Sequence, residues 1–167
     1  MNIRQLNEEK RSEARSLGLC DQWYDGWSDD ASVSDLLDKY VRGIDFVIKH
    51  HFPSDDDLVE YASRRELHEH GIYVNESVDG LRNETKPLIF NGNCSGKIIY
   101  DDFSVGNIYL RGKSDVEIYV RGLAKVFVEI YDDARVTVVN NGDSRCFVYL
   151  HGGKAEVIGD VVIRDKR

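Results

Sequence analysis

The side chains best suited to metal or acid–base chemistry gather in the first half of the chain, as three consecutive aspartates and four histidines. They are Asp55, Asp56, Asp57, His50, His51, His68 and His70. Adjacent histidines and an H-x-H pair project in different directions on a helix, unlike the i,i+4 histidines of metal-binding helices. Aspartates that follow a serine also complement the N-terminal end of a helix dipole. We therefore expect no metal and no cofactor, and keep the three aspartates as candidate contacts for a partner.

Motifs for nucleophilic catalysis and phosphate binding are not found in the sequence. Cys20, Cys94 and Cys146 are widely spaced and form no C-x-x-C pair, so they predict free thiols rather than a zinc or redox site. The glycine-rich stretch from Gly92 to Lys97 is one residue shorter than a P-loop and lacks the Ser or Thr that follows the lysine. We expect no catalytic residues.

Two tryptophans, Trp23 and Trp27, flank a Tyr-Asp-Gly segment between two predicted helices. Large rings in such a loop either anchor it to a small core or form a contact for a partner. The sequence leaves both interpretations open, so Trp23 and Trp27 are candidate interaction residues.

Charge is distributed unevenly along the 167 residues, whose formal net charge is -8. Residues 1–74 carry 9 Lys and Arg against 16 Asp and Glu, whereas residues 93–167 carry 11 of each kind. An acidic chain without clustered cations is not expected to bind nucleic acid directly, nor an anionic membrane surface. The polar start contains no apolar signal segment, so we expect a cytoplasmic protein, or a virion component if it is a phage structural protein.

The first half shows helical periodicity in three stretches. Residues 3–17 carry a thin apolar stripe that ends before Gly18. A second, more apolar helix is expected behind a serine cap at Ser34. The third helix is expected to begin after Ser54 and to end at Gly71.

The second half is a ten-residue repeat that starts at Asn93. Each block has a small residue in its second column and apolar residues two, four and six positions later, which is the period of a strand. Blocks end in pairs such as Arg-Gly and Asn-Gly, which favour turns. Ala155 resumes the pattern one position late, which predicts an inserted residue at Gly152-Gly153. The small residues are Cys94, Ser104, Ser114, Ala124, Ala134 and Ser144.

A small residue at the same place in every strand predicts a β-solenoid, in which it fills a tight inner corner of each coil. If two blocks form one coil, positions twenty apart stack, and two aromatic rows face outward. One row contains Tyr109 and Tyr149, and the other contains Phe127 and Phe147. Stacked outer rings are typical of a contact surface, so these four are candidate interaction residues. The alternative fold is an antiparallel meander or sandwich, because the turn sequences also suit hairpins.

The charge and the hydrophobic period both change near residue 90, which indicates two modules. We expect an α+β protein with an acidic helical module over residues 1–74. Residues 75–92 are expected to form a linker and a first strand, and residues 93–167 the β-solenoid of ten-residue repeats.

Four stretches carry a resemblance to a known group of proteins, namely LGLCDQWYDGW, YVRGIDFVIKHHFPS, HGIYVNE and the repeat blocks that end in VVIRDK. Together they resemble short uncharacterised proteins encoded by gut bacteria and their phages. The resemblance implies this architecture and a mobile-element setting, and it implies neither an activity nor functional residues.

These observations favour a non-enzymatic structural or protein-interaction protein, phage or prophage encoded, whose partner is another protein or a further copy of itself. The alternative is an acidic inhibitor that blocks a basic nucleic-acid-binding surface of a host or defence protein. An enzyme that acts on saccharides along the solenoid face is a third interpretation, less favoured because no catalytic motif is found.

Overall fold

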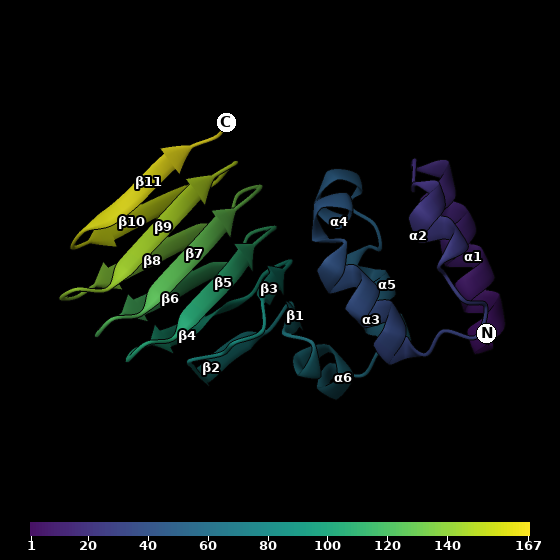
Figure 1. Ribbon diagram of the computed structural model, residues 1–167, viewed down its shortest axis with the longest axis horizontal. Coiled ribbons are helices and arrows are strands. Elements are labelled where there is room, and N and C mark those ends of the chain that lie inside the picture. The colour runs from purple at the N-terminus through teal and green to yellow at the C-terminus, as the bar shows by residue number, and fades with distance from the viewer. The chain divides into compact units, whose positions relative to one another are not determined.

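The computed structural model describes all 167 residues and divides into two compact units, Met1–His70 and Gly71–Arg167. The first unit contains six helices and the second contains eleven strands (Figure 1). The predicted α+β class, with a β-solenoid after a helical region, is confirmed. The segment 75–92 carries two strands, β2 (Ser77–Arg82) and β3 (Leu88–Asn91), and both pair with solenoid strands.

The helical unit has shorter helices than the sequence periodicity indicated. The second expected helix is divided at Gly43, and the third is divided where Ala62 adopts an extended conformation and Ser63 caps a new helix. The tryptophan segment, expected to be a loop, is partly helical. The helices are α1 (Ile3–Ser16), α2 (Asp21–Asp25), α3 (Val33–Arg42), α4 (Ile44–His50), α5 (Asp55–Tyr61) and α6 (Arg64–Glu69).

Four of these helices begin with a capping box. In each box the side chain of the N-cap residue accepts a hydrogen bond from the backbone N–H three residues later, and the side chain of that later residue accepts from the backbone N–H of the N-cap residue. The cap of α3 is Ser32 and not Ser34 as expected, because the Asp35 carboxylate bonds back to the Ser32 N–H. The acidic first turn of α5 behaves as expected, since Asp57 completes the box with Ser54.

The solenoid unit consists of two parallel sheets between which the chain alternates at every strand. The odd-numbered strands form one sheet in the order β1-β3-β5-β7-β9-β11, and the even-numbered strands form the other in the order β10-β8-β6-β4-β2. Figure 1 shows the two sheets as layers of one flat coil. The remaining strands are β1 (Ile72–Val74), β4 (Ser95–Tyr100), β5 (Val105–Leu110), β6 (Asp115–Val120), β7 (Lys125–Ile130), β8 (Arg135–Asn140), β9 (Arg145–Leu150), β10 (Lys154–Ile158) and β11 (Val161–Asp165).

Positions twenty apart stack throughout the central coils, as predicted for two blocks in each coil. Phe127 pairs with Phe147 in the odd-numbered sheet, and Lys97 pairs with Glu117 in the even-numbered sheet. All strand pairs are parallel, which excludes the antiparallel alternative because hairpins join antiparallel strands.

The last coil departs from the repeat in the opposite direction from the prediction. Ala155 pairs with Val136, a spacing of 19 residues, so the coil is one residue shorter rather than longer. Ala155 therefore occupies the first apolar column and not the small-residue column with which the sequence pattern aligned it. The next strand, β11, includes Arg164 and Asp165, the first two of the four charged residues that end the sequence.

The core of the solenoid lies between the two sheets. Its inward side chains are almost completely shielded from solvent, and the small corner residues Ser114, Ala124 and Ala134 are equally buried. The small-residue column thus lies inside the coils, except at Ser104, which is half-buried.

Candidate interaction surfaces

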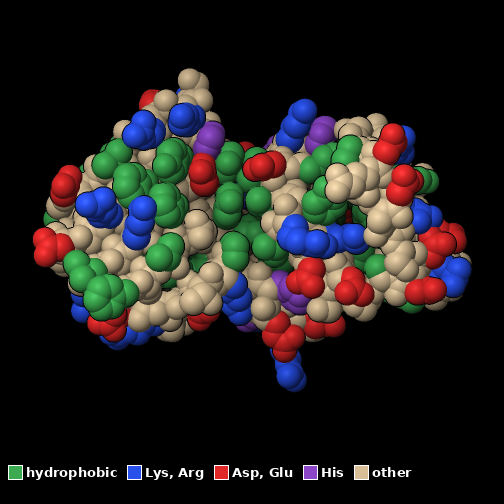
Figure 2. Space-filling view, viewed as in Figure 1, with side chains coloured by type: hydrophobic (Ala, Val, Ile, Leu, Met, Phe, Trp, Pro, Cys, Tyr) green, Lys and Arg blue, Asp and Glu red, His purple; other side chains and the backbone are tan.

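The outward side chains of β5, β7, β9 and β11 form a continuous surface, here called the aromatic face. Along the first three of these strands, buried inward residues alternate with outward residues that stay partly exposed. Figure 2 shows hydrophobic side chains lying beside Lys and Arg in the half of the view that contains these strands. The face comprises Val105, Asn107, Tyr109, Lys125, Phe127, Glu129, Arg145, Phe147, Tyr149, Val162 and Arg164.

Phe127 and Phe147 are the centre of the aromatic face. Their ring centroids lie 5.3 Å apart and the ring planes differ by 14°, and Val162 continues the row on β11. The Lys125 ammonium lies 5.3 Å from one ring centroid and 5.7 Å from the other. Both rings are half-buried, so the predicted outward aromatic row is present and partly accessible.

The predicted tyrosines lie in the neighbouring row of the same face. Tyr109 and Tyr149 are separated by Glu129, with which both are in register. The structure therefore brings the two phenylalanines and the two tyrosines onto one face, with a carboxylate between the tyrosines.

The unpaired charges on the aromatic face are positive. No carboxylate lies within 4.0 Å of Lys125, Arg145 or Arg164. The one carboxylate of the face, Glu129, lies 2.5 Å from Nε2 of His151. The face therefore combines aromatic rings with three cations that have no carboxylate partner.

The apolar surface continues onto the turns that precede β5 and β7. Phe103 is 79% exposed, Leu123 is 52% exposed and Val105 is 49% exposed. The Leu123 N–H donates to the Asp102 carbonyl oxygen, which stacks the two turns on each other. Hydrophobic exposure at this level in neighbouring coils makes these turns a candidate contact surface.

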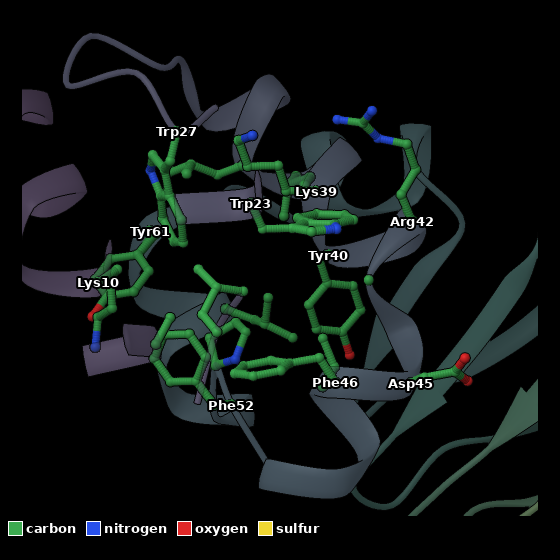
Figure 3. Close-up of a pocket in the computed structure, with 18 of the residues that line it drawn as sticks. Lys10, Trp23, Trp27, Lys39, Tyr40, Arg42, Asp45, Phe46, Phe52 and Tyr61 are labelled. Atoms are coloured by element: carbon green, nitrogen blue, oxygen red, sulfur yellow. The ribbon is translucent and has the colours of Figure 1, made fainter. Parts of the chain in front are cut away.

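A second candidate is a pocket of about 390 Å³ inside the helical unit, here called the aromatic pocket (Figure 3). Trp23 and Trp27 lie on one side of the hollow, and Phe46 and Phe52 lie on the opposite side. The two tryptophans are half-buried and pack against the small core of Ala14, Leu19 and Phe52, so they anchor their segment to a core as the first interpretation expected. They also line the pocket. The lining also includes Lys10, Lys39, Tyr40, Arg42, Asp45 and Tyr61.

Two cations lie over the indole rings of the aromatic pocket. The Lys39 ammonium is 5.8 Å from the ring centroid of Trp23 and 6.0 Å from that of Trp27. The Arg42 guanidinium is 5.7 Å from the Trp23 centroid. No carboxylate lies within 4.0 Å of either cation.

Lys10 also lines the pocket, but its charge is already compensated. Its ammonium donates to Glu13 at 3.0 Å and to Asp57 at 3.2 Å, and the Tyr61 hydroxyl donates to the same Asp57 carboxylate. Burial lowers the pKa of Lys10, but the hydrogen bonds outweigh burial and the net pKa is raised. Burial raises the pKa of the Asp57 carboxyl, but hydrogen bonds from Ser54, Tyr61 and Lys10 lower it by more. The pKa of Asp57 is therefore below its ordinary value.

The three candidate aspartates form the first turn of α5 in the helical unit. Asp57 is committed to the cap of α5 and to Lys10, whereas the Asp56 side chain is exposed and Asp55 is half-buried. Other acidic residues of the helical unit are also paired internally, as in Asp29 with Arg11 and Asp30 with Arg4. Much of the acidic surface is therefore already compensated by cations of its own unit.

Sequence reasoning missed the cations of both surfaces. Lys125 and Arg145 are twenty residues apart, so the repeat period that aligned the phenylalanines also aligned them. Lys39 and Arg42 gave no comparable signal, because their contact with Trp23 depends on how α2 packs against α3.

No group of three or more His, Cys, Asp and Glu side chains is arranged to hold a metal ion. The histidines take other contacts. Nε2 of His70 forms a hydrogen bond with the Ser34 hydroxyl and lies 3.2 Å from a carboxylate oxygen of Asp38. His51 is the C-cap residue of α4 and has a left-handed backbone conformation.

No family model, no curated protein and no solved structure matches the chain. The resemblance to proteins of gut bacteria and their phages therefore stays a prediction. None of the helices combines the length and the apolar composition that a membrane crossing requires.

Proposed function

We propose that the protein is a non-enzymatic interaction protein that binds an acidic partner protein through the aromatic face. The observation that carries the proposal is the stacked Phe127–Phe147 pair, half-exposed on the outer face of a rigid solenoid. Interface cores are enriched in aromatic side chains and arginine, and they depend on rigid anchors that lose little entropy on binding. Phe127 and Phe147 supply such anchors, and Arg145 lies in the adjacent row.

The charge of the face supports an acidic partner. Lys125, Arg145 and Arg164 present positive charge without a carboxylate neighbour, so a partner with Asp or Glu beside its apolar side chains is electrostatically complementary. In the alternative, an acidic inhibitor would bind its target through the helical unit. This alternative is less well supported, because several aspartates of that unit are already paired with cations of the same unit.

The test is affinity capture from the cells that make the protein, with mass spectrometry of the bound proteins. The wild-type chain is compared with a Phe127→Ser/Phe147→Ser variant, whose changes lie on the outer face and leave the buried core unchanged. We expect an acidic protein that the wild type captures and the variant loses, and that is released as the salt concentration rises.

The matched control carries two outward substitutions in the other sheet, Tyr119→Ser and Val139→Ser, which pair with each other across β6 and β8. This control is expected to capture the same acidic protein as the wild type. If the two double variants and the wild type capture the same proteins, the aromatic face is not the binding surface.

A further inference from the structure

We infer that the last coil of the solenoid binds a second copy of this chain, with β10 of each copy lying antiparallel to β11 of the other. The inference concerns the end of the stack and does not rest on the proposed function, which requires a different partner. β10 and β11 are the last strands of their sheets, and each pairs on one side only, with β8 and β9 respectively (Figure 1). Their outer edges therefore carry backbone N–H and C=O groups that another strand can bind.

The apolar side chains of this last coil are exposed, unlike those at the other end of the stack. Ile158 is 63% exposed, Ile163 is 42% exposed and Val162 is 40% exposed. Ile72 of β1, the first strand of its sheet, is completely shielded. Ile163 belongs to an inward row, because it is in register with the buried Val148. The core of the solenoid is thus open at the last coil, and apolar side chains that cover it would be buried favourably.

The directions of the two strands determine how two such ends can meet. The chain reverses at Gly159 and Asp160, so β10 and β11 run in opposite directions in the two sheets (Figure 1). A twofold axis along the strands exchanges the two sheets and places β11 of one copy beside β10 of the other, in antiparallel pairing. Both seams form together, because a twofold dimer uses the same surface on each copy.

One register of this pairing places opposite charges together. In it, Arg164 of one copy lies directly opposite Glu156 of the other, and both side chains point to the outer side of their sheets. Neither has an oppositely charged partner within 4.0 Å in its own chain. Opposite charges at directly opposed positions stabilise antiparallel strands, and like charges destabilise them. Pairing of each strand with its own copy, centred on the strand, would instead place Glu156 opposite a second Glu156.

The same register also brings apolar side chains together. Val162 lies opposite Ile158 on the outer side. Ile163 lies opposite Val157 on the inner side, where the open core of one copy meets that of the other. Charges on an edge strand ordinarily prevent it from pairing with another chain. Here they occur in an order that permits pairing with a second copy, so the two edges are complementary in backbone, apolar surface and charge.

The interface is small, because it consists of the end of one coil with two five-residue strands. Interfaces of this size are typical of weak, reversible complexes, so we expect a dissociation constant in the micromolar range. Sedimentation velocity of the purified full chain, over about a hundredfold range of concentration around this value, measures the association. The expected result is an equilibrium between monomer and dimer, without larger species.

Charge reversal tests the assigned pair of side chains. Glu156→Arg places two cations opposite each other and Arg164→Glu places two anions, so each variant alone is expected to dimerise about tenfold more weakly than the wild type. An equal mixture of the two variants should recover dimers, because each seam then joins one arginine to one glutamate. Such recovery also shows that both variants are folded.

The matched controls are Asp143→Arg and Lys113→Glu, which reverse exposed charges in turns of earlier coils. Both should dimerise as the wild type does. A wild type that stays monomeric at every concentration would overturn the inference, and so would assemblies larger than a dimer. A mixture of the two β10 and β11 variants that dimerises no better than either alone would contradict it, as would an equal loss of dimer in the controls.

Discussion

At the scale of single residues, Lys10 is the most constrained charge of the helical unit. It is 8% exposed, and its ammonium joins α1 to α5 through Asp57 while lying 5.3 Å from the Tyr61 ring centroid. A buried charge of this kind is retained because its partners compensate it, and removal of one partner leaves the other uncompensated.

Replacement of Lys10 by alanine is therefore expected to destabilise the helical unit by about 3 kcal/mol. The loss has two parts, since Asp57 keeps a partly buried charge and the aliphatic stem no longer packs against Phe52 and Tyr61. Urea unfolding followed by tryptophan emission measures this change. Arg4→Ala, which removes an exposed pair with Asp30, should change stability by less than about 1 kcal/mol.

The pKa shifts of the cap residues predict an acid-sensitive helical unit. Hydrogen bonds from Ser32 lower the pKa of Asp35, those from Ser63 lower that of Glu66, and Asp57 is lowered as described above. A carboxyl with a lowered pKa stabilises the fold at higher pH and loses this contribution as the pH falls through its folded-state pKa.

We therefore expect the tryptophan-detected unfolding midpoint to fall as the pH drops below about 4, the usual pKa of carboxyl groups. An Asp57→Asn variant should be less stable at neutral pH and should show a weaker acid dependence. An acid dependence as steep as that of the wild type would contradict the assigned role of Asp57.

The sequence predicted single residues well where a period constrained them. Phe127 and Phe147 were placed on one face because the repeat fixes which side chains point outward. The aromatic pocket was not predicted, although both tryptophans were noted, because its walls come from segments with no common period. The cap at Ser32 was missed by two residues, since Ser32 and Ser34 both precede the same apolar stripe and only the Asp35 bond selects between them.

At the scale of elements, the turns of the solenoid set how closely the coils stack. Gly112 has a φ of 64°, and a Cβ at this position would overlap the Gly92 carbonyl oxygen of the preceding coil. Gly142 has a similar φ of 72°, but nothing lies within 4 Å of a Cβ placed there. A side chain at Gly142 would therefore cause backbone strain alone, whereas a side chain at Gly112 would cause both backbone strain and steric overlap between coils.

We expect Gly142→Ala to cost about 1 kcal/mol, which is the strain of a positive φ alone. Gly112→Ala is expected to cost about 3 kcal/mol or more, because the coils must also move apart. Urea unfolding followed by far-ultraviolet circular dichroism compares the variants. Equal costs would show that this close approach between coils does not limit the stacking.

The period of the repeat was sufficient to predict the coil, because a parallel stack requires the same side-chain type at the same place in every layer. It was insufficient at the last coil, where Ala155 fits either the small-residue column or the first apolar column. Pairing with Val136 decides between them, and this choice depends on backbone register that the sequence does not contain.

At the scale of the whole molecule, charge is divided between the two units. Residues 1–70 contain the same 9 cations and 16 anions as residues 1–74, so the solenoid unit is close to neutral while its aromatic face is cationic. The acidic-inhibitor alternative requires an electrostatic partner at the acidic helical unit. The side-chain pairing instead favours the solenoid, because cations there lack partners and many aspartates of the helices have one.

This division predicts which substitutions change the salt dependence of partner binding. A Lys125→Gln/Arg145→Gln variant should bind more weakly at low salt and should show a shallower dependence on salt than the wild type. The affinity is measured by calorimetry with the captured partner at several salt concentrations. An unchanged salt dependence would mean that the aromatic face contributes no charge complementarity.

The most direct test of the central claim is the affinity of the purified partner for the wild type and for the two double-serine variants. If the aromatic face is the binding surface, Phe127→Ser/Phe147→Ser weakens binding by about tenfold or more, while Tyr119→Ser/Val139→Ser binds as the wild type does. Equal affinities for all three proteins would contradict the claim.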